Sequence, residues 1–439
     1  MRRLVVLAAS LALVNAALAN AALANAAEVR ITVLEPAVPL SLGRFVFEGG
    51  KTLDLSIGIG SGAWRGPNDP PDVVWTVSDR GPNIACSAAQ AVTGVARDRI
   101  CAEARGGRIY PTPHYAPSIY RLRLDEERRL FHVTDVITLK TLDGRPIDGM
   151  LNPLTVATTE IPLDGAGRRL AQNPSAVDAE GIVRLGDGTF WIGEENGPSI
   201  LHVAADGRIQ LRIVPDGTAR DYAGAGYPVR EGLPALLAKR QVNRGIESMA
   251  LSPDGRFLYF ILQNPLAHPD AAAYQQAKNT RLFKMDRHAQ RLVGQFVYRL
   301  DDPETFRLDP SNRQSDPRIS ELTAIGTDRL LVLERTEGTT KLYEVSLSGA
   351  TDILGSRWDD PATRPTLEQS NDLSGSGIVP LAKRLVFDSA DHREAPTKLE
   401  GVAVLPDGAL FLINDDDFGI TGERTVGLVV RGLPVRVGD

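Results

Sequence analysis

The sequence predicts an all-β protein, a β-propeller of about five to six four-stranded blades. The 439 residues include 41 Gly and 29 Pro, a share that is typical of chains rich in turns. A strand–turn–strand unit with one acidic register recurs along the chain, and further short β-rich segments usually follow it. Repeated units of four antiparallel strands are characteristic of propellers, so these observations together predict that fold class.

The first element is a leader that precedes the fold. Arg2 and Arg3 are followed by an apolar run over residues 4–13, and small-residue cleavage patterns come after it. We therefore expect a signal peptide over residues 1–26, one folded domain over residues 28–439, and a periplasmic or secreted location. An uncleaved membrane anchor is the alternative, which the shortness of the apolar run disfavours.

The first repeat unit carries an insertion near residues 81–115. Val73 to Val77 is predicted as its second strand, and residues 118–124 and 130–139 as its outer strands. The insertion holds both cysteines of the chain, Cys86 and Cys101. In an exported protein a disulfide between them is expected, and it would stabilise the fold by about 3 kcal/mol. Two buried free thiols are the alternative.

Four later units each begin with a glutamate at the head of an apolar strand and reach an aspartate seven residues later. These heads are Glu180, Glu247, Glu321 and Glu400. In three of the units the aspartate precedes a glycine, which is the strongest short signal for a hairpin. The second strands end in polar residues, namely Glu194-Glu195-Asn196, Gln263-Asn264, Glu334-Arg335 and Asn414-Asp415-Asp416-Asp417.

The last unit has room for only three strands before the chain ends at Asp439. A strand from the N-terminal region is therefore expected to close the ring, because an open sheet edge would invite aggregation. We predict that Phe45-Val46-Phe47 supplies it. Five blades are apparent in the sequence, and a sixth, degenerate blade is left open.

The repeat register predicts that acidic side chains gather at one mouth of the ring. A tight hairpin returns the chain beside its start, so the heads and the polar endings emerge at the same end. Two carboxylates about 5 Å apart repel by roughly 3 kcal/mol at an effective dielectric constant of 20, so they must take up protons, pair with a base or bind a cation. Oxygen ligands suit a hard cation, with Ca²⁺ first and Mg²⁺ or Mn²⁺ next.

Candidate site residues follow from this register. The candidate catalytic residues are Glu180, Glu247, Glu400, Arg80 and Arg335, where each arginine either binds a phosphate or serves as a salt-bridge partner. The candidate metal ligands are Asp79, Glu194, Glu195, Glu321, Glu334, Asn414, Asp415 and Asp416. For any single glutamate the alternative is a hydrogen bond to a backbone amide of the neighbouring blade.

Composition and missing motifs narrow the function. The net charge of −6 removes the electrostatic case for a nucleic-acid binder, and no segment after the leader is apolar for long enough to cross a membrane. The sequence contains no serine-hydrolase elbow, zinc-protease motif or nucleotide-binding loop. We expect a small phosphorylated or ester molecule as the partner, and a monomer is one of the states that the sequence leaves open.

Several blocks of sequence, in this order, carry a resemblance. They are Ser78-Asp79-Arg80-Gly81, Asp178-Ala179-Glu180-Gly181-Ile182, Phe190-Trp191-Ile192-Gly193-Glu194-Glu195, Gly245-Ile246-Glu247-Ser248-Met249-Ala250, Leu331-Val332-Leu333-Glu334-Arg335, and Lys398-Leu399-Glu400-Gly401 through Asn414-Asp415-Asp416-Asp417-Phe418-Gly419. Over residues 40–432 the chain resembles the phytase-like family, also called the esterase-like activity of phytase family. It departs at Asp416, where asparagine is expected, and at Ser248, where glycine is expected.

The resemblance implies a secreted or periplasmic β-propeller with recurrent acidic residues that hydrolyses phosphoric esters. We therefore expect a metal-dependent hydrolase of phosphoric mono- or diesters, with calcium as the first candidate cofactor. One alternative is a lactonase or carboxyl-ester hydrolase of the gluconolactonase type. Another is a propeller without catalytic activity that binds a ligand or a protein.

Overall fold

The computed structural model describes residues 28–156 and 159–438, which form an all-β fold with only short helices. The leader predicted over residues 1–26 lies outside the described residues. No helix in the described part of the chain has the length and apolar character that a membrane crossing needs.

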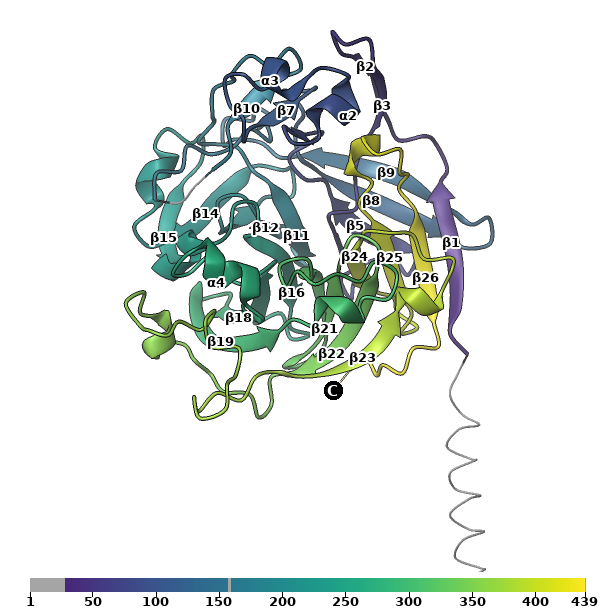
Figure 1. The fold of residues 1–439 in the computed structure, drawn as a ribbon. Coiled ribbons are helices and arrows are strands. Elements are labelled where there is room, and N and C mark those ends of the chain that lie inside the picture. The colour runs from purple at the N-terminus through teal and green to yellow at the C-terminus, as the bar shows by residue number, and fades with distance from the viewer. Residues whose placement is uncertain (1–27, 157–158, 439) are drawn as a thin grey trace, which may run out of the picture.

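Five groups of mainly antiparallel strands, called sheets below, make up the body of the described chain, and the first and fifth join edge to edge into one eight-stranded sheet (Figure 1). The first contains β4 (Gly62–Trp64), β5 (Val73–Val77), β8 (Ser118–Asp125) and β9 (Leu130–Thr138). The second contains β11 (Ala179–Arg184), β12 (Phe190–Glu194), β13 (Ser199–Val203) and β14 (Ile209–Pro215), with β15 (Val229–Leu233) added in parallel. The third contains β16 (Ile246–Leu251), β17 (Phe257–Leu262), β18 (Asn279–Asp286) and β19 (Arg291–Arg299). The fourth contains β20 (Arg318–Gly326), β21 (Arg329–Arg335), β22 (Thr340–Ser346) and β23 (Ala382–Asp388).

The fifth sheet is completed by the N-terminal end of the described chain. It contains β24 (Leu399–Val404), β25 (Leu410–Asn414), β26 (Gly427–Arg431) and β1 (Arg30–Pro36). Strand β1 pairs antiparallel with β26, from Arg30 opposite Arg431 to Leu34 opposite Gly427. The expected closure by an N-terminal strand is therefore present, and it covers an edge that would otherwise be open.

The prediction that Phe45-Val46-Phe47 supplies the closing strand was wrong. Phe45 and Val46 belong to β2 (Ser41–Val46), which forms a hairpin with β3 (Thr52–Ser56) away from the fifth sheet. The physical reason is packing: Leu34 of β1 is buried in the core of the ring, whereas Phe45 and Phe47 pack against the cysteine-bearing insertion.

The first strands of the five sheets meet around a central axis. Strand β4 contacts β11, β11 contacts β16, β16 contacts β20, β20 contacts β24, and β24 contacts β4. These contacts close on themselves, so the five sheets surround the axis in the manner of propeller blades (Figure 1). Apolar clusters fill the spaces between neighbouring sheets and hold the ring together, as Tyr259 and Leu322 do between the third and fourth sheets.

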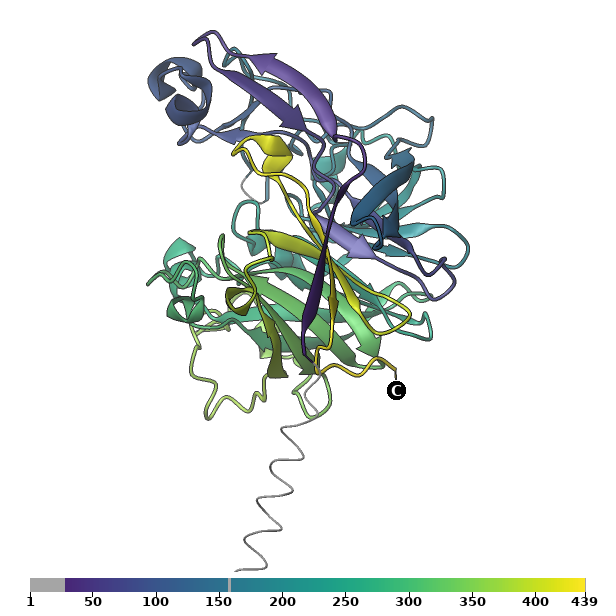
Figure 2. The same cartoon turned by 90° about the vertical axis from the view of Figure 1, so that its right-hand side faces the viewer.

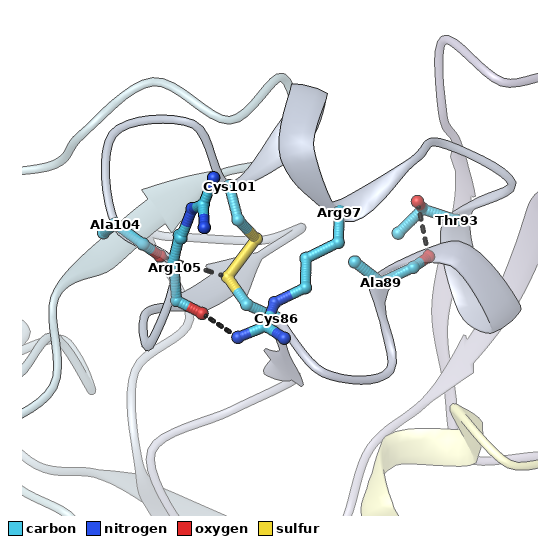
Figure 3. The surroundings of a disulfide bond; sticks show 7 residues. All are labelled: Cys86, Ala89, Thr93, Arg97, Cys101, Ala104 and Arg105. Atoms are coloured by element: carbon cyan, nitrogen blue, oxygen red, sulfur yellow. Dashed lines mark hydrogen bonds between the residues drawn. A yellow bond between two sulfur atoms is a disulfide. The ribbon is translucent and has the colours of Figure 1, made fainter.

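The insertion forms a small unit beside the ring, seen at the top of Figures 1 and 2. It is built from β6 (Ile84–Ala85), α2 (Ala89–Thr93), α3 (Arg97–Ile100) and β7 (Arg108–Tyr110), and β10 (Pro162–Asp164) from a later segment pairs in parallel with β7. The expected disulfide between Cys86 and Cys101 is present, and both cysteines are buried in a separate apolar cluster of this unit (Figure 3). In the same figure Arg97 donates a hydrogen bond of 2.7 Å to the carbonyl of Arg105.

The other helices are single turns in loops. They are α4 (Ala271–Gln276), η1 (Ala219–Tyr222), η2 (Ala235–Lys239), η3 (Pro303–Thr305), η4 (Arg357–Asp359), η5 (Ser389–Asp391) and η6 (Asp417–Gly419). Of these, η6 matters for the site, because Asp417 and Phe418 line the cavity described below. Both residues have positive φ angles, 48° and 55°, which is uncommon for residues other than glycine.

Candidate active site

A charged cavity of about 280 Å³ opens at one end of the ring. Its walls come from all five sheets, where the first strands begin and the second strands end. Antiparallel hairpins bring these two kinds of strand end together, as the repeat register predicts. Eight of the predicted site residues line the cavity: Asp79, Arg80, Glu180, Glu195, Glu247, Arg335, Glu400 and Asp415.

Three glutamates from three different sheets meet in this cavity. One carboxylate oxygen from each of Glu180, Glu247 and Glu400 lies within 4.8 Å of the other two. We call these residues the glutamate triad. They converge because each sits at a β-bulge, where the strand bends and the extra residue is re-aimed. In the third sheet, for example, Ile246 is opposite Leu262 and Ser248 is opposite Ile261, which leaves Glu247 without a partner residue.

The fourth predicted head, Glu321, does not join the triad. In β20 the bulge comes one residue earlier, because Ile319 is opposite Glu334 and Glu321 is already opposite Leu333. Ser320 therefore takes the bulged position, and its hydroxyl lies 3.4 Å from Glu247 Oε1. The expectation that Glu321 is equivalent to the other three heads was wrong.

The side chain of Glu321 instead forms hydrogen bonds near the centre of the ring. Its side chain is buried and accepts hydrogen bonds from the backbone amides of Ala63, at 2.9 Å, and Leu322, at 3.0 Å. Ala63 belongs to β4 of the first sheet, so this carboxyl group links two blades. This is the alternative stated above for a single glutamate at a blade edge.

The polar strand endings divide between the cavity and the sheets. Side chains alternate between the two faces of a strand, so at the ends of β12, β21 and β25 only one residue of each adjacent pair faces the cavity. Accordingly Glu195, Arg335 and Asp415 line the cavity, whereas the preceding residues, Glu194, Glu334 and Asn414, do not. Asp416 does not line it either.

The four polar residues that miss the cavity have partners of their own. Glu194 forms an ion pair of 2.8 Å with Arg212. Glu334 accepts hydrogen bonds from the Tyr298 hydroxyl, at 2.7 Å, and from Lys383, at 2.9 Å. Asn414 accepts a hydrogen bond from the amide of Val426 at 2.6 Å, and Asp416 accepts one from Ser56 at 2.5 Å. The structure thus places these four predicted ligands outside the cavity, each with a partner in the surrounding sheets and loops.

A second acidic group adjoins the triad and was only partly predicted. One carboxylate oxygen from each of Asp79, Asp178 and Glu180 lies within 4.8 Å of the other two, so Glu180 belongs to both groups. Asp178 was not among the predicted site residues. Its place two residues before a repeat head is the signal that would have found it.

Burial and mutual repulsion raise the pKa values of these acids. Burial, followed by the charges of Glu247 and Asp178, raises the pKa of Glu180 well above its usual value. The pKa of Glu247 is raised to about 8, first by burial and then by Glu400. Glu247 Oε2 is buried and makes no hydrogen bond within the described residues. The arrangement therefore favours either a proton or a cation between the carboxylates.

Six basic side chains line the same cavity: Arg80, Arg108, Arg244, Arg318, Arg335 and Lys398. Arg335 forms a close ion pair with Glu400 of the triad, and Lys398 lies 3.3 Å from Asp415. Four of the six were not predicted. Arg244, Arg318 and Lys398 precede repeat heads by two or three residues, a pattern that the sequence contains but that attention to acids alone overlooks.

Comparisons with known proteins place this chain in a family. A model of the phytase-like family, described as esterase-like activity of phytase, matches residues 61–418. An uncharacterized secreted protein of Arthroderma benhamiae is 23% identical over 364 residues, which cover 74% of this chain and 66% of that protein. The chain thus spans just under two thirds of the length of this relative.

Solved structures of low similarity also match. The PQQ-bound aldose sugar dehydrogenase from Streptomyces coelicolor is 11% identical, with a TM-score of 0.32 and coverage of 92% of this chain and 99% of that chain. Virginiamycin B lyase from Staphylococcus aureus is 11% identical, with a TM-score of 0.30 and the same coverage.

Proposed function

The chain belongs to the phytase-like family, and from this premise we propose that it is a metal-dependent hydrolase of phosphoric mono- or diesters. The observation that carries the proposal is the meeting of three carboxylates from three sheets in a cavity that six basic side chains also line. Carboxylates suit a hard cation, and guanidinium groups suit phosphate oxygens. A cavity of about 280 Å³ suits a small-molecule substrate.

We propose that the triad of Glu180, Glu247 and Glu400 holds the cation, with Ca²⁺ as the first candidate and Mg²⁺ or Mn²⁺ next. The donor set fits, because it consists of oxygen atoms alone and the buried Glu247 Oε2 has no hydrogen-bond partner among the described residues. A divalent cation bound there would act as a Lewis acid toward a phosphoryl oxygen. Asp79 and Asp178 lie close enough to contribute through the adjoining group.

The residues of the chain supply the remaining steps. Arg335 is held by Ser320, at 2.9 Å, and by Glu400, so its guanidinium is already oriented when a phosphate group arrives. Glu195 lies outside the triad and lines the cavity, where its buried Oε1 forms an ion pair of 3.6 Å with Arg244. Burial and the charge of Glu247 raise the pKa of Glu195, and in its deprotonated form Glu195 would act as the base for the attacking water.

A turnover assay tests the proposed function. We expect the purified protein to hydrolyse members of a panel of phosphomonoesters and phosphodiesters when Ca²⁺, Mg²⁺ or Mn²⁺ is present. Treatment with EDTA should abolish turnover, and adding back the active cation should restore it. A parallel panel of lactones and carboxyl esters serves as the comparison. The absence of phosphoester turnover with every cation would overturn the proposal.

The stability of the metal-free protein is expected to fall as pH rises. The folded protein keeps protons on Glu180 and Glu247 above about pH 4.3, where an unfolded glutamate releases its proton. Between that pH and the folded pKa, which is about 8 for Glu247, the unfolded chain binds fewer protons, so the free energy of unfolding decreases with pH. A bound cation compensates the carboxylate charges in place of those protons, so the free energy of unfolding should no longer fall as pH rises.

Thermal unfolding at several pH values checks this expectation. The difference in Tm between calcium-loaded and EDTA-treated protein should widen from about pH 5 to about pH 8. A Glu247→Gln variant, which cannot carry the charge, should show a smaller change with pH. A difference in Tm that stays constant or narrows would contradict the expected linkage.

We also propose that the protein is exported. The signal peptide predicted over residues 1–26 supports export, as does the description of the Arthroderma benhamiae relative as a secreted protein. The disulfide between Cys86 and Cys101 is compatible with an oxidising compartment.

A further inference from the structure

We propose that Arg318, beside Arg335, forms an anion subsite of the cavity, and that Glu337 occupies this subsite as an internal ligand until an anionic group of the substrate displaces it. The inference deepens the proposed function, on which it rests for the identity of the anion as a phosphate group. It goes beyond that function by assigning roles to Arg318 and Glu337.

Two arginines lie side by side at the cavity end of the fourth sheet. Arg318 of β20 and Arg335 of β21 are directly opposite each other in the strand pairing, and both line the cavity. Like charges in opposite positions of neighbouring strands are destabilising unless an anion compensates them. This pair therefore creates a place for negative charge at the cavity wall.

Glu337 compensates the pair in the structure. One of its carboxylate oxygens forms a close ion pair with Arg318, and the other lies 4.0 Å from Arg335 Nη1. Each oxygen thus faces a different guanidinium, as two oxygens of a phosphate group would. Partial desolvation at the cavity wall opposes ionisation of Glu337, but Arg335 and Arg318 outweigh it and lower its pKa to about 2, so the carboxylate stays charged.

The two arginines differ in how many of their guanidinium donors form hydrogen bonds within the protein. Arg335 donates hydrogen bonds to Ser320 Oγ at 2.9 Å and to the carbonyl of Thr336 at 3.1 Å, and it pairs with Glu400. Arg318 Nε, in contrast, is buried and makes no hydrogen bond to any described residue. Arg318 therefore retains a donor for an incoming anion, and leaving this donor unpaired has a cost that a bound anion removes.

Glu337 is placed so that its side chain can leave without disturbing the fold. Its side chain is 64% exposed, and it lies in the turn between β21 and β22. Asp309 holds the backbone of this turn, because it accepts hydrogen bonds from Thr336 Oγ1 at 2.6 Å and from the amide of Gly338 at 2.7 Å. A doubly charged phosphate competes well with a single exposed carboxylate for two guanidinium groups.

Calorimetric titration with inorganic phosphate tests the proposal on the full chain. Arg318→Gln should raise the Kd for phosphate by about tenfold, because it removes a charged donor. Glu337→Gln should lower that Kd by about threefold or more, because it removes the competing carboxylate. The opposite signs separate an anion subsite from a structural salt bridge, whose loss from either side would leave phosphate affinity unchanged or weaken it.

Matched controls exist outside the cavity. Arg184→Gln removes an arginine whose side chain is 26% exposed and which pairs with Asp69 at 3.0 Å. Glu48→Gln removes a carboxylate that is 58% exposed and pairs with Arg99. Both controls should leave phosphate affinity unchanged. Phosphate binding that Glu337→Gln weakens or leaves unchanged would overturn the proposal, and this variant decides the question even if Arg318→Gln does not fold.

The titrations are run on both EDTA-treated and calcium-loaded protein. Failure of the proposed hydrolase function and failure of the anion subsite then give different results. If no phosphoester is hydrolysed but the two variants shift phosphate affinity in opposite directions, the subsite stands and the hydrolase function falls. If phosphoesters are hydrolysed but neither variant moves phosphate affinity, the subsite falls and the hydrolase function stands.

Discussion

Replacing Glu180 by glutamine is expected to lower calcium affinity by about a hundredfold or more and phosphoester turnover by about 10²- to 10³-fold. Glu180 belongs to both acidic groups of the cavity, so its loss weakens both groups at once. The substitution keeps the shape of the side chain and removes its charge. Calcium titration by calorimetry and steady-state kinetics at saturating cation measure the two effects.

Glu321→Gln is the matched control for this substitution. Glu321 heads the same repeat in the sequence, but it lies outside the cavity and accepts hydrogen bonds from the amides of Ala63 and Leu322. We expect this variant to lower Tm, since an amide cannot accept in place of both carboxylate oxygens, and to keep the calcium affinity of the parent protein. Equal losses of calcium affinity in the two variants would contradict the separation of the triad from Glu321.

Arg212→Leu is expected to lower the free energy of unfolding by about 3–5 kcal/mol. Arg212 and Glu194 are buried in the second sheet and form an ion pair of 2.8 Å. Arg212 also donates hydrogen bonds to Asn152 Oδ1 at 3.1 Å and to the carbonyl of Ala176 at 2.8 Å. Its removal leaves the carboxyl group of Glu194 buried without a countercharge, and unpaired buried charge is among the costliest defects in a fold.

Guanidinium chloride unfolding of the calcium-loaded protein measures this cost. An exposed pair supplies the comparison: Arg44→Leu breaks the ion pair with Asp54, whose side chain is 74% exposed, and should leave the free energy of unfolding nearly unchanged. The double variant Arg212→Leu with Glu194→Leu should recover part of the loss, because no unpaired charge remains. A single Arg212 variant no less stable than the Arg44 variant would refute the structural role assigned to this pair.

The sequence alone located most of the candidate site. The convergence of Glu180, Glu247 and Glu400 could be predicted, because a hairpin turn at a constant distance from each head forces equivalent strand ends to one side of the ring. The disulfide between Cys86 and Cys101 could be predicted because the chain has no other cysteine. The first inference depends on a local pattern that repeats along the chain, and the second depends on the chain's single pair of cysteines.

The rest of the site depends on shifts of one position along a strand, and a local sequence pattern does not specify such shifts. The bulge in β20 falls at Ser320 and not at Glu321, and this shift of one position turns a carboxylate from the cavity to the centre of the ring. Strand alternation likewise admits Glu195 and excludes Glu194. Both members of each pair are acidic or polar, so composition could not choose between them.

What the sequence determined by itself is therefore the all-β class, the repeated strand–turn–strand unit and the end of the ring at which acids collect, because strand periodicity and turn chemistry act over a few residues. Tertiary packing determined the choice of β1 as the closing strand, the places of the bulges and the arrival of Arg108 among the acids. These features depend on contacts between residues far apart in the chain, such as Arg30 opposite Arg431, and no local pattern encodes such contacts.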